Sequence, residues 1–272
     1  MLAQLFSDIN SIWVKYGEVY LTGIKNTLIL SIVATLIGVL IGFVCGILQT
    51  IPIFPADHWL RRVLLRILRA VIRIYVEVFR GTPMILQAVF IYYGVPYFTG
   101  VVFKNIWTVS IIVVSINTGA YMAESVRGGI MSIDPGQFEG AKAIGMNHFQ
   151  TMLYIVLPQT LRNIMPQIGN NYIINVKDTS VMFIIGFQDF FAVHKMVSGA
   201  IFKYFPSALL EMGGYLFLTL VASFLLRWFE RKLEGKGNYE LVSADTLVGA
   251  AGTYSYSGDA PYDEKNRDIR KP

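Results

Sequence analysis

Charged residues are scarce in this chain of 272 residues, because Asp, Glu, Lys and Arg make up only 15% of it. Soluble domains are usually about 25% charged. Hydrophobic residues make up 54% of the chain, and the mean hydropathy is +0.52. A soluble domain of this composition would expose large apolar patches and aggregate. The composition therefore argues against an ordinary soluble enzyme, and we expect the chain to lie in a lipid bilayer.

Cysteine, histidine and catalytic motifs are also rare. Cys45 is the single cysteine, and the three histidines lie far apart. This excludes a disulfide framework and a cysteine-based metal cluster, so we predict no metal site. The sequence has no G-x-x-x-x-G-K-[ST] run to cradle the phosphates of ATP, and no G-x-S-x-G, HExxH or CxxC motif. We therefore predict neither catalytic residues nor a nucleotide site on this chain.

Long uncharged stretches are what the sequence does have. A helix needs about 20 apolar residues to cross the hydrocarbon core, and strands are excluded because no alternating segments of about 10 residues repeat. We predict an all-α, polytopic membrane protein with five transmembrane helices. These helices are expected at residues 26–48, 81–103, 105–123, 163–188 and 204–226.

Lysines and arginines predict the orientation, since they gather on the cytoplasmic side of a membrane protein. Seventeen of them lie in residues 50–80, in residues 125–162 or after residue 226, and only five lie in the opposite segments. We therefore expect the N-terminus outside and the C-terminus in the cytoplasm. Residues 1–20 carry Asp8, Lys15 and Glu18 and do not resemble a cleavable signal. We interpret them as an arm outside the cytoplasm.

Two polar segments flank the spans. Residues 59–78 carry arginines at helical spacing with Leu and Ile between them, which favours an amphipathic helix on anionic lipid over a nucleic-acid site. Residues 21–232 would then be the transmembrane domain. Residues 233–272 are rich in Gly, Ser, Tyr, Asp and Lys without sustained periodicity, and this predicts a disordered cytoplasmic tail.

The cytoplasmic loop at residues 125–162 predicts two short helices. Asp134 is a good N-cap with Pro135 at the first helical position, and Gly145 is a plausible C-terminal cap. Asn147 begins a second helix that we expect Pro158 to break. Small residues on the first helix would let a groove of another protein approach closely: Gly140, Ala141 and Ala143.

This loop resembles the "EAA" loop of the permease subunits of binding-protein-dependent ABC importers. That pattern is Glu-Ala-Ala, three residues, Gly, nine residues, Ile, any residue, Leu-Pro. The chain matches every spacing and departs from the pattern only at the second position. The matching residues are Glu139, Ala141, Gly145, Ile155, Leu157 and Pro158, and Gly140 stands where the pattern has Ala.

Further segments resemble the polar amino acid group of these permeases: YVEVFRGTP at 75–83, AYMAESVRGGI at 120–130, LPQ at 157–159 and KDTS at 177–180. The resemblance covers roughly residues 20–232. It implies a type I ABC importer fold in a prokaryotic inner membrane. It also implies a dimer of ABC ATPase subunits that grips the Glu139 helix and carries ATP and Mg²⁺. A second permease subunit, an external solute-binding protein and a polar amino acid substrate complete the expected partners.

Candidate substrate-binding residues lie at charges inside the expected spans. Lys177 and Asp178 are costly there without partners, and a zwitterionic amino acid would need a charge of each sign. An interhelical salt bridge is the structural alternative. The same hypothesis includes polar or aromatic side chains near these two or in other spans: Thr179, Ser180, Asn175, Tyr121, Glu124 and Gln87.

Several alternatives stay open from the sequence. Glu124 could face a cavity or lie at the membrane edge, and Glu77 and Arg80 have the i, i+3 spacing of an ion pair. For the whole chain, a passive channel or a regulatory membrane scaffold is the alternative to a permease of an ATP-driven importer.

Overall fold

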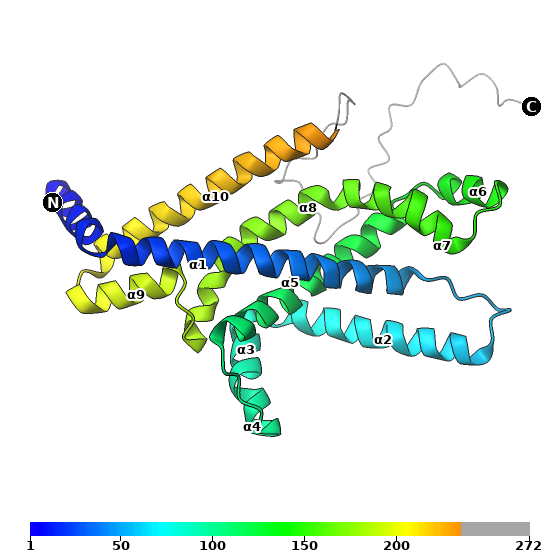
Figure 1. Cartoon of the computed structure of the whole chain (residues 1–272), viewed down its shortest axis with the longest axis horizontal. Helices are drawn as coiled ribbons and strands as arrows, with labels where there is room; N and C mark the ends of the chain where they lie inside the picture. Colours follow the sequence, from blue (N-terminus) through cyan, green and yellow to red (C-terminus); the bar gives the residue numbers. More distant parts are fainter. Residues whose placement is uncertain (235–272) are drawn as a thin grey trace, which may run out of the picture. The chain divides into compact units, whose positions relative to one another are not determined.

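Every element of the described chain is helical, because a segment in lipid must satisfy its own backbone hydrogen bonds. The computed structural model describes residues 1–234, and among these there is no β-strand. The elements are α1 (Leu2–Thr50), α2 (Trp59–Gly81), α3 (Met84–Val89), η1 (Phe90–Gly94), α4 (Val95–Thr99), α5 (Ile106–Met131), α6 (Pro135–Ala143), α7 (His148–Thr151), η2 (Met152–Val156), α8 (Leu157–Asp178), η3 (Thr179–Ile185), α9 (Phe190–Ile201) and α10 (Tyr204–Glu234) (Figure 1).

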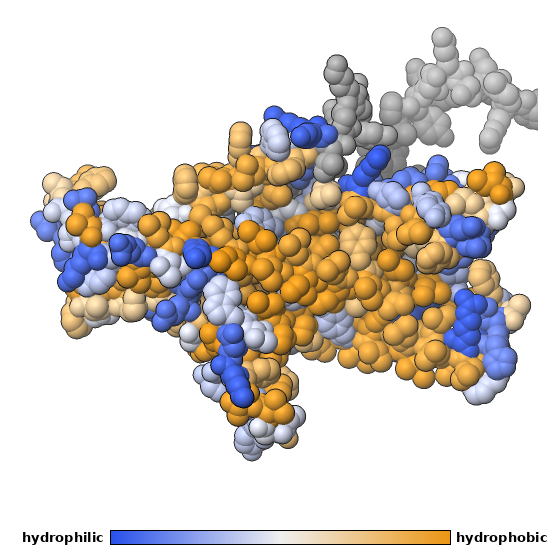
Figure 2. Space-filling model, in the orientation of Figure 1, coloured by the Kyte–Doolittle hydropathy of each residue, from blue (hydrophilic) through white to orange (hydrophobic). Residues whose placement is uncertain are grey.

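The number of candidate spans agrees with the sequence. Three helices are long and apolar enough to cross a membrane, namely Leu2–Thr50, Ile106–Met131 and Tyr204–Lys232. Two bent pairs raise the number to five if each is one span: Trp59–Gly81 with Met84–Thr99, and His148–Ile185 with Phe190–Ile201. Figure 2 shows apolar side chains over the middle of the bundle and polar ones gathered toward both ends.

The boundaries of two spans differ from the prediction. α1 begins at Leu2 rather than at residue 26, so the N-terminal arm is a continuous extension of the first helix. The arginine-rich helix α2 packs on α5 and α1 and joins Met84–Thr99 through a bend of 113°. The bend follows from Pro83, which drives the preceding Thr82 to φ −122° and ψ 146° and so ends α2.

Residues 59–78 do form the predicted amphipathic helix, and its buried residues are Leu65, Ile72 and Val76. At the other end of the chain, α10 continues to Glu234. Residues 233 and 234, which were predicted to belong to the tail, are therefore helical, and residues 235–272 lie outside the described residues.

The most extensive packing in the fold joins α1 to α5. Small residues repeat every fourth position on α1, and this spacing lets two helix backbones approach closely in a membrane. At the centre, a Cβ atom added to Gly42 would lie 2.3 Å from Met122 Cβ and 2.8 Å from the Met122 carbonyl carbon. Only glycine fits this crossing.

We expect Gly42→Ala to destabilise the bundle by about 1–3 kcal/mol, because the added methyl overpacks against a rigid backbone. Unfolding in detergent should show the loss as a lower midpoint. Gly128→Ala on α5 is the matched control, since an added Cβ there meets nothing within 4 Å. Equal midpoints for the two variants would contradict this account of the crossing.

α10 is attached mainly near its N-terminal end. The Ser207 Oγ lies 2.7 Å from the Tyr20 hydroxyl and 2.8 Å from His194 Nδ1, and the Tyr215 hydroxyl donates to Asp189 Oδ2 at 3.3 Å. Only 11% of the apolar window of α10 is buried within the chain. Most of this apolar window is thus exposed, and lipid or another subunit can contact it.

Candidate functional site

The Lys177–Asp178 pair lies where α8 changes to the tighter helix η3. α8 ends at Asp178, and η3 ends at Ile185, where Gly186 follows with φ 91°. Lys177 is exposed and Asp178 is half-buried. Among residues 1–234, no ion pair joins either of them to another side chain. The interhelical salt bridge considered from the sequence is therefore absent from the described part of the chain.

Two polar neighbours of this pair are engaged in the fold. Asn175 is buried, and its amide nitrogen donates to Thr35 Oγ1 at 2.7 Å and to Thr118 Oγ1 at 2.9 Å. It therefore ties α8 to α1 and α5. Thr179 is fully buried, and its hydroxyl donates to the Val176 carbonyl at 3.1 Å. Ser180 remains half-buried at the same turn.

Gln87 holds the bend between α2 and α3. Its side chain is buried, and its amide nitrogen donates to the carbonyls of Phe79 and Thr82, both at 2.9 Å. Asn117 on α5 donates to the Gln87 Oε1 at 3.0 Å. All these hydrogen bonds are made to other residues of the chain, so Gln87 stabilises the bend between α2 and α3.

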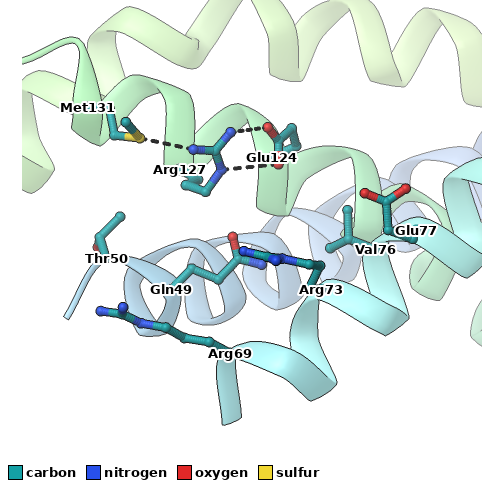
Figure 3. A pocket seen from close by; sticks show the side chains of 9 residues that line it. All are labelled: Gln49, Thr50, Arg69, Arg73, Val76, Glu77, Glu124, Arg127 and Met131. Atoms are coloured by element: carbon teal, nitrogen blue, oxygen red, sulfur yellow. Dashed lines mark hydrogen bonds and ion pairs between the residues drawn. The ribbon is translucent and has the colours of Figure 1, made fainter. Parts of the chain in front are cut away.

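A charged cavity of about 600 Å³ lies between α1, α2 and α5. Figure 3 shows Arg69 and Arg73 reaching from α2 toward the end of α1, with Glu124 and Arg127 across from them on α5. Arg127 is hydrogen-bonded through two of its nitrogens to the Glu124 carboxylate. Glu124 thus faces a cavity, and it is paired there.

Two side-chain arrangements in this region differ from the ones that the sequence suggests. Glu77 does not pair with Arg80; it lines the cavity, while the Arg80 guanidinium lies 5.5 Å from the ring centroid of the exposed Tyr121. The sequence favours lipid contact for the arginines of residues 59–78, whereas Arg69 and Arg73 line the cavity. Glu77 lies four residues after Arg73 and therefore on the same face of the helix. Two charged residues on one face indicate from the sequence that this face borders a polar environment rather than lipid tails.

The loop between α5 and α8 has the predicted caps. The Asp134 carboxylate accepts from the Gly136 backbone N–H at 2.7 Å, and Gly145 has φ 80°. Asn147 and Gln150 form a reciprocal capping box, each side chain accepting from the other's backbone N–H at 2.9 Å. The two short helices α6 and α7 are therefore held at the end of the bundle (Figure 1).

Pro158 does not break the second helix, contrary to the prediction. The π-helical turn η2 precedes it, and the Leu157 N–H bonds to the Met152 carbonyl. Pro158 then lies within the first two residues of α8, where its missing N–H costs little. α7 consequently continues through η2 into α8, and the loop is joined rigidly to a span.

Two of the three small residues expected on the exposed surface of α6 lie there, and the third, Ala141, does not. Ala141 is only 2% exposed and points inward, whereas Glu139, Gly140 and Ala143 are exposed. A Cβ added to Gly140 would meet nothing within 4 Å. Ile144 is also 77% exposed beside them. The outer face of α6 is thus open to another protein, but Ala141 does not belong to it.

Comparison with known proteins identifies the family. The model of the binding-protein-dependent transport system inner membrane component matches residues 51–235. The chain belongs to this family. It is 32% identical over 227 residues to the glutamine transport system permease protein GlnP of Escherichia coli (strain K12), covering 84% of this chain and 98% of that protein. The putative glutamine permease of Rickettsia bellii is 32% identical over 220 residues, covering 81% and 96%.

Solved structures agree with this family. A crystal structure of an amino acid ABC transporter with histidines has a TM-score of 0.70 and 33% identity, covering 80% of this chain and 96% of that one. An inward-facing MetNI methionine ABC transporter has a TM-score of 0.65 at 18% identity, which supports the fold alone. The predicted family, the all-α membrane fold and the inner-membrane location are confirmed. The orientation stays a prediction.

Proposed function

We propose that this permease subunit of an amino acid ABC importer carries glutamine or a similar polar amino acid inward. The family membership and the likeness to glutamine permeases support this substrate class. The single observation that carries it is the similarity to GlnP along almost the whole length of that protein. An amino acid with a neutral polar side chain is a zwitterion, so its path needs charges of both signs.

The substrate contacts proposed for the path are Lys177 and Asp178, with Ser180 beside them. Their support is that both charges lack an ion-pair partner among residues 1–234, although unpaired charges are costly in a span. A cation can bind the α-carboxylate, and a carboxylate can bind the α-ammonium. Asn175, Thr179 and Gln87 support the helices around this path, because their polar groups are already bonded within the fold.

The cavity beside Glu124 is proposed as the inner part of the same path. It offers charges of both signs in about 600 Å³. Tyr121 lies one helical turn before Glu124 on α5, where its ring contacts Arg80. Glu124 and Arg127 neutralise each other at rest. A zwitterionic amino acid can replace this ion pair: its ammonium binds Glu124 and its carboxylate binds Arg127, so neither side chain is left unpaired.

ATP hydrolysis is assigned to a separate pair of ATPase subunits that hold ATP and Mg²⁺. This chain has no P-loop sequence. The exposed face of α6, with Glu139 and Gly140, and the rigid junction from α7 to α8 support a docking and coupling role for this loop. Gly145 allows the chain to turn between the two helices.

Two further partners complete the proposal. A second permease subunit, identical or related, would provide the other half of the path. A solute-binding protein would dock at the opposite end, near residues 95–104 and 188–204, and would deliver the amino acid. α6 and α7 lie at the other end of the bundle from the α9–α10 turn, which supports this separation of the two docking sites (Figure 1).

Reconstitution of the permease with its ATPase and solute-binding protein in lipid vesicles tests this function. We expect ATPase activity to rise severalfold when the binding protein carries glutamine, and labelled glutamine to accumulate only with ATP. A passive channel would equilibrate glutamine without ATP, and a regulatory scaffold would transport nothing. The binding protein left empty is the control.

A further inference from the structure

Phe202, between α9 and α10, is held in an unusual conformation. It has φ 53° and ψ 27°, and it is the one non-glycine residue with positive φ among residues 1–234. A bulky side chain in this left-handed region is strained. Its ring is also 93% exposed, so the chain gains no packing in return. Such a residue stays in place only when the surrounding structure holds it there.

The surroundings of Phe202 do hold it. Lys203, the next residue, forms an ion pair with Asp8 of α1, with Nζ and Oδ1 2.6 Å apart. Deeper in the same corner, Ile12 packs with Val193 and Val197 of α9 in one buried cluster. The N-terminal extension of α1 thus braces the α9–α10 turn on which Phe202 stands.

The position of this corner along α1 places it beyond the bilayer. The uncharged stretch of α1 starts at residue 26 and is long enough to cross the hydrocarbon core by itself. Going along α9 and into the turn after it, successive contacts lie closer to the N-terminus of α1. The Phe190 N–H donates to Thr27, and the Lys203 ammonium donates to Asp8. Asp8 precedes residue 26 by 18 residues, or about 27 Å of helix.

Phe202 precedes the candidate span Tyr204–Lys232 by two residues, but the Ser207 hydroxyl of that helix lies 2.7 Å from the Tyr20 hydroxyl of α1. The first turn of α10 therefore also lies beside the part of α1 that precedes residue 26, and lipid tails do not cover the Phe202 ring. Other aromatic side chains on the same corner are exposed as well, with Phe6 at 69%, Phe205 at 66% and Tyr204 at 57%. Exposed aromatic clusters of this kind mark surfaces that bind proteins. The corner also lies at the opposite end of the bundle from α6 and α7 (Figure 1).

We infer that Phe202 is the central anchor of the surface that docks the solute-binding protein, and that the N-terminal extension of α1 is the brace that presents it. This inference rests on the proposed function. The partner it fits is a water-soluble protein with an apolar pocket for one phenyl ring and an acidic group that faces Lys195, whose Nζ lies 5.3 Å from the ring centroid of Tyr204. The flanking aromatic side chains form the apolar rim of the contact.

Phe202→Gly is the decisive variant, because glycine adopts positive φ without strain and removes only the ring. We expect its affinity for the solute-binding protein to fall roughly thirtyfold, as for a hot-spot aromatic residue. Thermal stability should be unchanged or higher. Phe202→Tyr, which keeps the ring, should bind nearly as well as the wild type. Affinity is measured with the permease–ATPase complex in lipid nanodiscs.

A second measurement locates the residue independently of binding. With Cys45→Ala in place, Phe202→Cys should react quickly with a water-soluble maleimide, and the solute-binding protein should slow the reaction. Slow labelling without that protein would indicate that lipid or a second permease copy covers residue 202, and this result would overturn the inference. So would unchanged affinity in Phe202→Gly. If the wild type binds no solute-binding protein while residue 202 labels quickly, the proposed function fails together with the docking surface.

Discussion

Replacing Gly140 with tryptophan is expected to weaken binding of the ATPase by roughly ten- to hundredfold. Interfaces pack as densely as protein interiors, and overpacking costs about 1–3 kcal/mol. The variant should still fold, because a Cβ at position 140 meets nothing within 4 Å and Gly140 is exposed. Binding of purified ATPase to the permease in detergent measures the effect directly.

The control for this change is Gly199→Trp, a matched substitution at an open glycine on α9, near the other end of the bundle. It should leave ATPase binding unchanged. Ala141→Trp separates docking from folding: Ala141 is 2% exposed, so the larger ring should lower the thermal stability of the permease. Normal ATPase binding by Gly140→Trp would remove α6 from the coupling interface.

Asp178→Asn is expected to raise the glutamine concentration needed for half-maximal transport by roughly ten- to hundredfold. Losing one charge-assisted hydrogen bond costs about 1.5–3 kcal/mol. Thermal stability should change little, because no ion pair to another side chain is broken among residues 1–234. Transport into vesicles at varied glutamine concentration, in parallel with unfolding, distinguishes the two effects.

The double variant Lys177→Gln with Asp178→Asn completes this test. A substrate site should not regain transport when both charges are gone, whereas a structural pair should. Thr179→Val is the neighbouring control: it removes a buried hydroxyl bonded to its own helix, so it should affect stability more than substrate affinity. Wild-type transport by the double variant would exclude Lys177 and Asp178 from the site.

The family and the helix caps could be predicted from the sequence, because they depend on local chemistry. Asp134, Gly145 and Asn147 each act on a neighbouring backbone group, so their spacing alone indicated the two helices of the loop. Long uncharged stretches likewise indicated five spans, since the length needed to cross a bilayer is a property of one helix.

Side-chain partners could not be predicted in the same way. Glu77 and Arg80 have the spacing of an ion pair, yet Arg80 turns to Tyr121 and Glu77 to the cavity. Asn175 has the chemistry of a substrate ligand, but two threonines from other helices occupy its amide nitrogen. The partner of each of these side chains depends on contacts between segments that are far apart in the sequence.

The sequence by itself thus determined the membrane class, the family and the position of the loop that carries the two short helices. Only the tertiary structure decided that Ala141 points inward, that α2 lines a charged cavity and that Phe202 is held outward by α1. The physical reason is that hydropathy and capping act within a few residues, whereas the direction of a side chain is set by which helix packs beside it. That neighbour is 195 positions away in the pairing of Lys203 with Asp8.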